Sequence, residues 1–137
     1  MFRFMQWGVT NASLLAGAEA AIRFHETIGA KRIEERAIAL TTRLRAGLDS
    51  IANVTIYSSR HPAMLTGTTI WGIDGVAARD LQEALWTEAK VRVRAAGAGT
   101  PPSVRQCCHV YTTMADVDRS VAAARLLAQR LPRQDPA

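Results

Sequence analysis

Hydrophobic side chains recur at spacings of three and four along two stretches in the first third of the chain, which is typical of amphipathic helices. The first stretch is Ala12–Ile28, which Asn11 can cap and Gly29 ends. The second is Ala30–Ile51, whose apolar positions are Ile33, Ala37, Leu40, Leu44, Leu48 and Ile51. We therefore expect two consecutive helices before any strand.

After residue 51 the pattern changes to short apolar runs between turn residues, which predicts strands and shorter helices. The expected elements are strands at Val54–Tyr57 and Leu65–Ile73, a helix at Val76–Ala89, strands at Val91–Arg94 and Val104–Tyr111, and a final helix at Met114–Leu131. Thr113 and Asp116 have the spacing of a capping box for the final helix. This order predicts an α/β (α+β, two-layer) fold, in which helices cover one face of a small three- to four-stranded sheet.

Composition and charge exclude several classes of protein. The 137 residues are 48% hydrophobic and 21% charged, which fits one globular domain. The net charge is +5, but the arginines of the first third are mixed with glutamates, and no basic aromatic stripe or phosphate-binding glycine loop accompanies them. The uncharged stretch Phe4–Ala18 is too short and polar to span a membrane, and Met1–Phe4 lacks a signal-peptide pattern. We expect a cytoplasmic protein that binds neither nucleic acid nor membrane.

Both cysteines lie in the segment Ser103–Thr113. Alternate residues of a strand share a face, so the two adjacent cysteines should point to opposite sides. One face would hold Arg105, Cys107, His109 and Tyr111, and the other Val104, Gln106, Cys108 and Val110. Adjacent cysteines fit ordinary disulfide geometry poorly, and zinc needs about four ligands at workable spacing. We therefore expect two small buried thiols and no metal site.

Arg105 is the polar residue of this segment with the clearest chemistry. Its position between Val104 and Gln106, in a strand that leads directly to a helix cap, indicates that it is shielded from solvent. A guanidinium presents a planar fork that can bind a carboxylate through two hydrogen bonds. The alternative is a structural ion pair with an acidic side chain. Residue chemistry leaves both interpretations open.

The sequence VRQCCHVYTTMADVDR, residues 104–119, resembles the carboxyl-terminal motif of class V aminotransferases. This family of fold-type I pyridoxal-phosphate enzymes includes cysteine desulfurases and isopenicillin N epimerases. Its motif is approximately apolar-Arg-apolar-Ser-x-His-x-Tyr-Asn-Thr, and residues 7–48 are similar to its entry into a long interdomain helix. The resemblance spans about Arg3 to Leu131. It implies a remnant of the interdomain segment at 1–10, the small carboxyl-terminal domain at 11–131 and a disordered tail at 132–137.

The resemblance also implies roles for particular residues. Arg105 stands at the arginine that binds the substrate's α-carboxylate, and His109 is a second substrate-binding candidate. Gly8, Thr10 and Asn11 stand near the Gly-Thr pair that contacts the cofactor phosphate, although Val9 occupies the position of the family threonine. The alternative is that Thr10 and Asn11 only cap the first helix.

The family's cofactor-bound lysine lies in a large domain, and the two lysines here, Lys31 and Lys90, stand in no matching motif. The resemblance therefore implies that this chain holds no catalytic residue and binds no pyridoxal phosphate alone. Its expected partners are the large domain, an amino-acid substrate and a second copy of the chain. Aminotransferase, epimerase and C–S lyase chemistry all stay open. The loop Ala95–Pro102 contains no cysteine, which argues against persulfide transfer.

Two other functions are compatible with the residues. The chain could be a stand-alone domain that binds an anionic metabolite through Arg105, Arg92 and Arg94. It could also be a protein-association module, because an apolar patch of this kind marks an interface. The patch consists of Phe2, Phe4, Met5 and Trp7.

Overall fold

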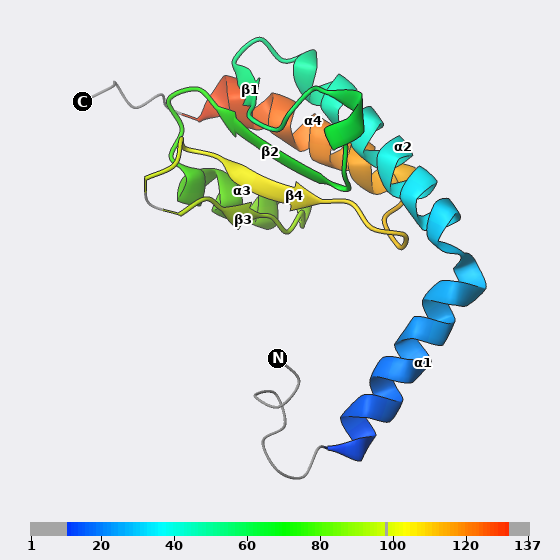
Figure 1. Ribbon diagram of the computed structural model, residues 1–137. Helices are drawn as coiled ribbons and strands as arrows, with labels where there is room; N and C mark the ends of the chain where they lie inside the picture. The colour runs from blue at the N-terminus through cyan, green and yellow to red at the C-terminus, as the bar shows by residue number, and fades with distance from the viewer. Residues whose placement is uncertain (1–10, 98, 132–137) are drawn as a thin grey trace. The chain divides into compact units, whose positions relative to one another are not determined.

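The computed structural model describes residues 11–97 and 99–131 (Figure 1). Its elements are α1 (Ala12–Ile28), α2 (Ala30–Asp49), β1 (Val54–Ile56), the 3-10 helix η2 (Pro62–Met64), β2 (Thr68–Ile73), α3 (Ala78–Ala89), β3 (Arg94–Ala95), β4 (Val104–Cys107) and α4 (Met114–Arg130). The chain divides into two compact units between Ile33 and Glu34, within α2. Each unit is described by itself.

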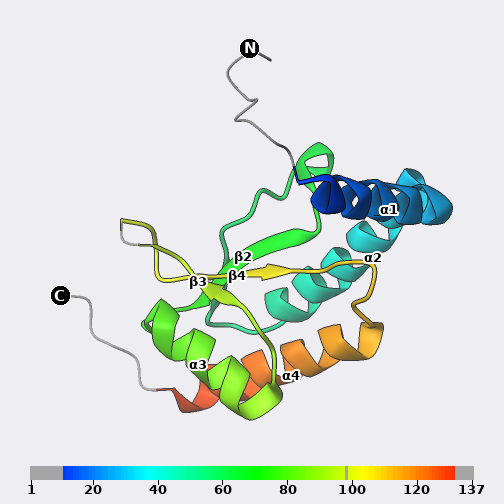
Figure 2. The same ribbon diagram turned by 90° about the horizontal axis from the view of Figure 1, so that it is seen from below.

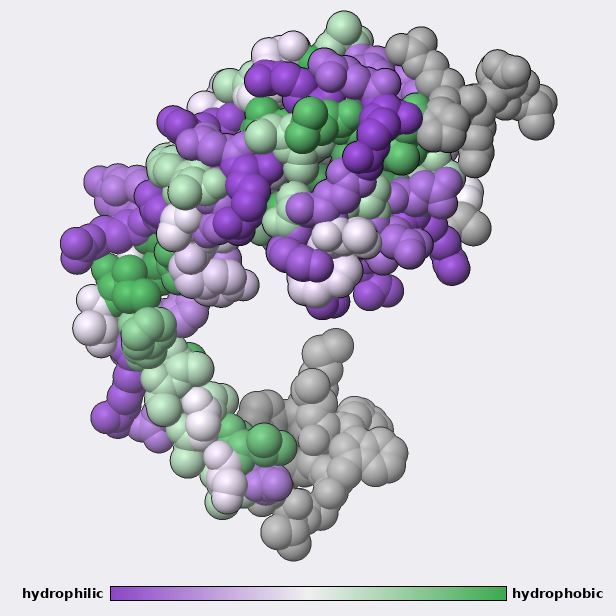
Figure 3. All heavy atoms as spheres, turned by 180° about the vertical axis from the view of Figure 1, so that it is seen from behind, coloured by the Kyte–Doolittle hydropathy of each residue, from purple (hydrophilic) through white to green (hydrophobic). Residues whose placement is uncertain are grey.

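The first unit contains α1, whose two ends agree with the sequence prediction. Asn11 Oδ1 accepts hydrogen bonds from the backbone N–H groups of Ser13 and Leu14, at 3.1 and 3.2 Å. Gly29 follows the helix with a φ of 93°, a conformation that favours glycine. No residue of α1 is buried, and hydrophobic side chains recur along it (Figure 3). The large exposed ones are Leu14, Leu15, Ile22 and Phe24.

The second unit is built on a four-stranded sheet of order β1-β2-β4-β3, in which every neighbouring pair is antiparallel. The later part of α2, with α3 and α4, lies on one side of this sheet (Figure 2). Trp71 of β2 and Val104 of β4 point into the core with no exposed surface. The fully buried leucines around them are Leu40, Leu44, Leu48, Leu81, Leu85 and Leu127. The predicted α/β fold with helices over one face of a small sheet is confirmed.

Two predicted strands start in the wrong place. β2 begins at Thr68 rather than Leu65, because Pro62–Met64 forms a helical turn and Leu65 N bonds the Pro62 carbonyl at the end of that turn, at 3.2 Å. The predicted strand Val91–Arg94 is replaced by β3, which begins at Arg94. Lys90 ends α3 in the left-handed region with a φ of 55°, and Val91 N then bonds the Leu85 carbonyl of α3 at 3.1 Å. The backbone just after α3 therefore completes the helix end instead of pairing with a strand.

The predicted strand Val104–Tyr111 is too long at its end, since β4 stops at Cys107. The next residues form a turn, in which Thr112 N donates to the His109 carbonyl at 2.9 Å and His109 N donates to Thr112 Oγ1 at 3.0 Å. Arg36 of α2 donates to the Thr112 carbonyl at 3.0 Å. These contacts hold the chain in a reversal that leads into α4.

Candidate functional site

The face of the sheet opposite the helices carries Arg105. Along β4, Val104 and Gln106 are buried, whereas Arg105 and Cys107 are exposed. The predicted alternation of faces is confirmed within this strand. The expectation that Arg105 is shielded from solvent is wrong for this chain, because the helices of the second unit cover only the other face of the sheet.

The register of the sheet fixes the neighbours of Arg105. Its direct cross-strand partners are Ile70 of β2 and Arg94 of β3, and both are exposed. Within the part of the chain that the structure describes, Arg105 and Arg94 have no hydrogen bond or ion pair to a carboxylate. Two arginines therefore stand directly opposite each other on an uncovered surface, with an apolar residue next to Arg105.

Like charges directly opposite each other across two strands destabilise a sheet. Arg94 and Arg105 form such a pair, and an anion bound between them would offset their repulsion. A guanidinium binds a carboxylate or another planar oxyanion through parallel hydrogen bonds. The pair is therefore suited to an acidic ligand.

Replacing Arg94 with threonine should raise the free energy of unfolding by up to about 0.5 kcal/mol at low ionic strength. The gain should shrink in high salt, because salt screens the repulsion between exposed charges. Urea unfolding of both proteins at two salt concentrations checks this. A gain of the same size at both concentrations would point to strand propensity instead of charge.

The two cysteines diverge, as the strand pattern predicts. Cys107 is exposed, with its Sγ 3.5 Å from the Thr68 hydroxyl, so the expectation that it is buried is wrong. Cys108 is buried, and this burial is the main cause that raises the pKa of its thiol. Both thiols are free. Over residues 11–97 and 99–131, no three His, Cys, Asp or Glu side chains gather in a way that could hold a metal ion.

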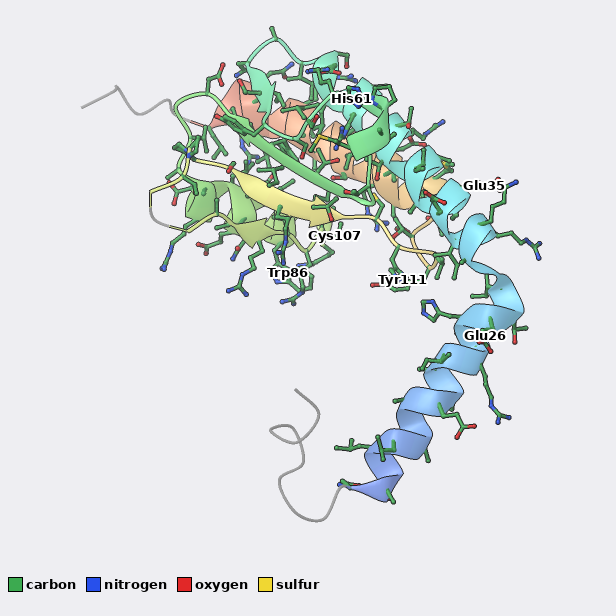
Figure 4. All side chains as sticks on the ribbon, in the orientation of Figure 1. Glu26, Glu35, His61, Trp86, Cys107 and Tyr111 are labelled. Carbon is green, nitrogen blue, oxygen red and sulfur yellow. The ribbon has the colours of Figure 1, made fainter. Side chains whose placement is uncertain are left out.

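His109 does not lie on the same strand face as Arg105, because the turn begins after β4 ends. The prediction that His109 and Tyr111 continue the alternation of β4 is wrong. The two rings instead contact each other at a tilt of 32° within the turn, with centroids 4.9 Å apart. Tyr111 is 82% exposed (Figure 4). The register thus brings Arg94 to Arg105, a pairing that the sequence did not reveal.

Asp116 is the carboxylate that the motif places near this turn, and it is engaged in starting α4. Its N–H donates to Thr113 Oγ1 at 3.1 Å and its Oδ2 accepts from Thr113 N at 2.9 Å, which completes the predicted capping box, and Oδ2 also accepts from Thr113 Oγ1 at 2.7 Å. These bonds are the main reason that the pKa of Asp116 lies below its ordinary value. Its Oδ1 accepts from Arg119 at 2.6 Å. Asp116 therefore serves the helix end.

A buried hydrogen-bond network behind Arg105 was not predicted. Gln106, the next residue in β4, accepts from Trp71 Nε1 at 3.1 Å and donates to Ser120 Oγ of α4 at 2.9 Å. All three side chains are buried. An amide at an inward strand position is the sequence signal that could have indicated such a network, because a buried amide needs partners. The network fixes β4 between β2 and α4.

Of the three residues predicted to contact the cofactor, the structure describes only Asn11. Gly8 and Thr10 lie outside the described residues. The side-chain oxygen of Asn11 is used by the first turn of α1, as the capping alternative expects. A contact of Asn11 with a cofactor phosphate stays a prediction.

The described residues do not fit pyridoxal phosphate. Covalent attachment of this cofactor needs a lysine inside a pocket of ligand size, with a carboxylate for the pyridine nitrogen. Lys90 is exposed at the end of α3, where its Nζ donates to the Thr87 carbonyl at 3.3 Å. The hollow shared by Lys90 and Asp116 measures only about 210 Å³, and Asp116 is already paired. Lys31 lies on the exposed surface of the first turn of α2.

Comparison with known proteins places this arrangement in a family. Residues 4–120 match the aminotransferase class-V family. The chain belongs to that family. Its members depend on pyridoxal phosphate, and the resemblance seen in the motif is confirmed. No curated protein matches the chain.

Solved structures of longer proteins share the fold of this class V chain. The apo cysteine desulfurase from Thermococcus onnurineus is 26% identical with a TM-score of 0.84, over 92% of this chain and 33% of the other. The cysteine desulfurase CsdA from Escherichia coli is 19% identical with a TM-score of 0.81, over 93% and 33%. A NifS-like protein from Rickettsia africae is 19% identical with a TM-score of 0.76, over 90% and 36%. The chain thus spans about a third of the length of these proteins.

Within the described residues, no helix combines the length and the apolar character that crossing a membrane requires.

Proposed function

We propose that this chain is the small domain of a pyridoxal-phosphate-dependent enzyme that acts on an amino acid, and that Arg105 binds the α-carboxylate of the substrate. The observation that carries the proposal is the position of Arg105. It stands on the uncovered face of the sheet, in the arginine position of the family motif, without a carboxylate partner among the described residues. The cofactor itself would be held by a separate large domain. That domain would lie against the uncovered face of this chain's sheet when the substrate is bound.

The rigidity of β4 supports this role. A bound carboxylate is oriented well only if the guanidinium that holds it is itself fixed, since small displacements of reacting groups are costly. Arg105 is flanked by two strands in register, and its neighbour Gln106 is locked to Trp71 and Ser120. The backbone that carries the guanidinium is therefore tied to the core on three sides.

The finer features of the enzyme stay predictions. These are the reaction type, whether aminotransferase, epimerase or C–S lyase, the homo-oligomeric state and the cytoplasmic location. His109 stays a candidate for contact with the substrate from the turn after β4, where its backbone is fixed by Thr112. Its position indicates a contact at the edge of the site rather than beside Arg105.

A chimaera tests the proposal. The matching third of the Thermococcus onnurineus desulfurase is replaced with this chain, and its turnover of L-cysteine is measured. Arg105→Ala should lower kcat/KM at least about tenfold, because a hydrogen bond to a charged group contributes about 1.5–3 kcal/mol. Added guanidinium ions should restore part of the activity.

Arg125→Ala is the matched control, since Arg125 is an exposed arginine of α4 that bonds only Ser50 in the described structure. It should leave kcat/KM unchanged. An active chimaera in which Arg105→Ala has no effect would remove Arg105 from the substrate site. Tight binding of an amino acid by this chain alone, lost in Arg105→Ala, would instead favour the stand-alone metabolite-binding function.

A further inference from the structure

A hollow of about 660 Å³ lies at the outer edge of the sheet, between α3 and residues 92–97. α3 contributes Arg79, Glu83 and Trp86 at helical spacing, and the β3 segment contributes Arg92 and Arg94. Trp86 extends outward from α3 and is 44% exposed (Figure 4). Apart from Arg94, none of these side chains has a part in the proposed carboxylate site.

The charges in this hollow are unbalanced. Arg79 and Arg94 have no ion pair within the described residues, and the single carboxylate of the lining, Glu83, pairs with no described arginine. The guanidinium carbon of Arg92 lies 4.3 Å from the centroid of the Trp86 ring, and Lys90 Nζ lies 5.4 Å from it. An exposed indole thus lies beside two cations, in a hollow that two further arginines line, which favours an acidic ligand.

β3 is the strand at this edge of the sheet, and its backbone is not free to pair with an added strand of a ligand. The outward N–H of Ala95 donates to Gln82 Oε1 of α3 at 2.6 Å. A ligand in the hollow must therefore be recognised by the arginines and by Trp86, rather than by the backbone of β3.

The exposure of these arginines decides what kind of acid fits. A single exposed ion pair contributes little in water, because solvent and salt screen it. A small anion would meet one or two such groups and bind weakly. A polypeptide with several acidic residues could contact all the arginines, cover Trp86 and exclude water, and tryptophan and arginine are the residues that dominate the binding energy of protein interfaces.

We propose that this surface, formed by Arg79, Trp86, Arg92 and Arg94, is a docking site for an acidic segment of a partner protein. The proposal does not depend on the role of Arg105. The partner's carboxylates would contact the arginines, and an apolar side chain of the segment would pack on the exposed part of Trp86.

The test uses the complete chain and a fluorescently labelled synthetic peptide of glutamate, aspartate and leucine, with fluorescence anisotropy as the readout at low and at physiological salt. The variant Arg79→Gln/Arg92→Gln should weaken binding about tenfold or more, which corresponds to about 1.4 kcal/mol. Trp86→Ala should also weaken it. Circular dichroism and the unfolding midpoint establish that each variant is folded.

The control variant Arg32→Gln/Arg125→Gln removes the same charge from exposed positions elsewhere and should change the affinity less than about twofold. Equal weakening by both double variants would overturn the proposal in favour of non-specific attraction. Displacement of the peptide by phosphate or citrate at equal concentration would overturn it in favour of a small-anion site. Absence of any binding would also overturn it.

Arg105→Ala should leave peptide binding intact, and Arg79→Gln/Arg92→Gln should leave the chimaera active, so the two proposals can fail separately.

Discussion

Replacement of Gln106 by leucine is expected to lower the free energy of unfolding by about 3 kcal/mol. Leucine fills a similar volume but cannot form hydrogen bonds. Trp71 Nε1–H and the Ser120 hydroxyl, both on side chains without exposed surface, would each lose a partner. An unpaired buried polar group costs about 1–3 kcal/mol, and the leucine side chain offers no group that could replace the amide. Urea unfolding followed by circular dichroism measures the loss.

Two further variants separate hydrogen bonding from packing. Gln129→Leu makes the same chemical change at an exposed position of α4 and should leave stability nearly unchanged. The double variant Gln106→Leu/Ser120→Ala removes one of the two unpaired groups and should recover about 1 kcal/mol relative to Gln106→Leu alone. If Gln106→Leu proved as stable as the parent chain, the amide would not be the element that fixes β4.

Replacement of Arg45 by methionine is expected to lower the free energy of unfolding by about 2 kcal/mol. Arg45 of α2 reaches across to the start of β2. Its guanidinium donates to Thr69 Oγ1 at 3.2 Å, to the Ser59 carbonyl at 2.8 Å and to the Thr68 carbonyl at 3.2 Å. Methionine preserves the packing of the aliphatic stem but loses all three bonds, one of which satisfies the fully buried Thr69 hydroxyl.

Arg43, two residues earlier on the same helix, is the matched control. It forms a bidentate pair with Asp118 at 2.6 and 2.9 Å, which lowers the pKa of that carboxyl, but both side chains are about half exposed. Exposed ion pairs contribute little to stability, so Arg43→Met should move the unfolding midpoint only slightly. Equal losses for the two variants would show that the contacts of Arg45 with β2 and the loop before it add nothing beyond a surface charge.

Features that depend on a few neighbouring residues could be predicted from the sequence. Asn11 and Gly29 bound α1, and Thr113 with Asp116 begins α4, because a cap is formed by groups within three or four residues. The alternation of buried and exposed residues from Val104 to Cys107 follows from the twofold period of a strand. The order of these elements and the motif around Arg105 were also sufficient to identify the family.

Tertiary structure decided where the strands stop and which side chains meet. The turn that ends β4 is held by Arg36, which is far away in the sequence, and the delayed start of β3 depends on the end of α3. The opposition of Arg94 and Arg105 follows from strand register, which is set by pairing across the whole sheet. The exposure of Arg105 likewise depends on which face the helices cover. Sequence thus determined the local elements and the arginine, whereas long-range packing determined the surface on which that arginine stands.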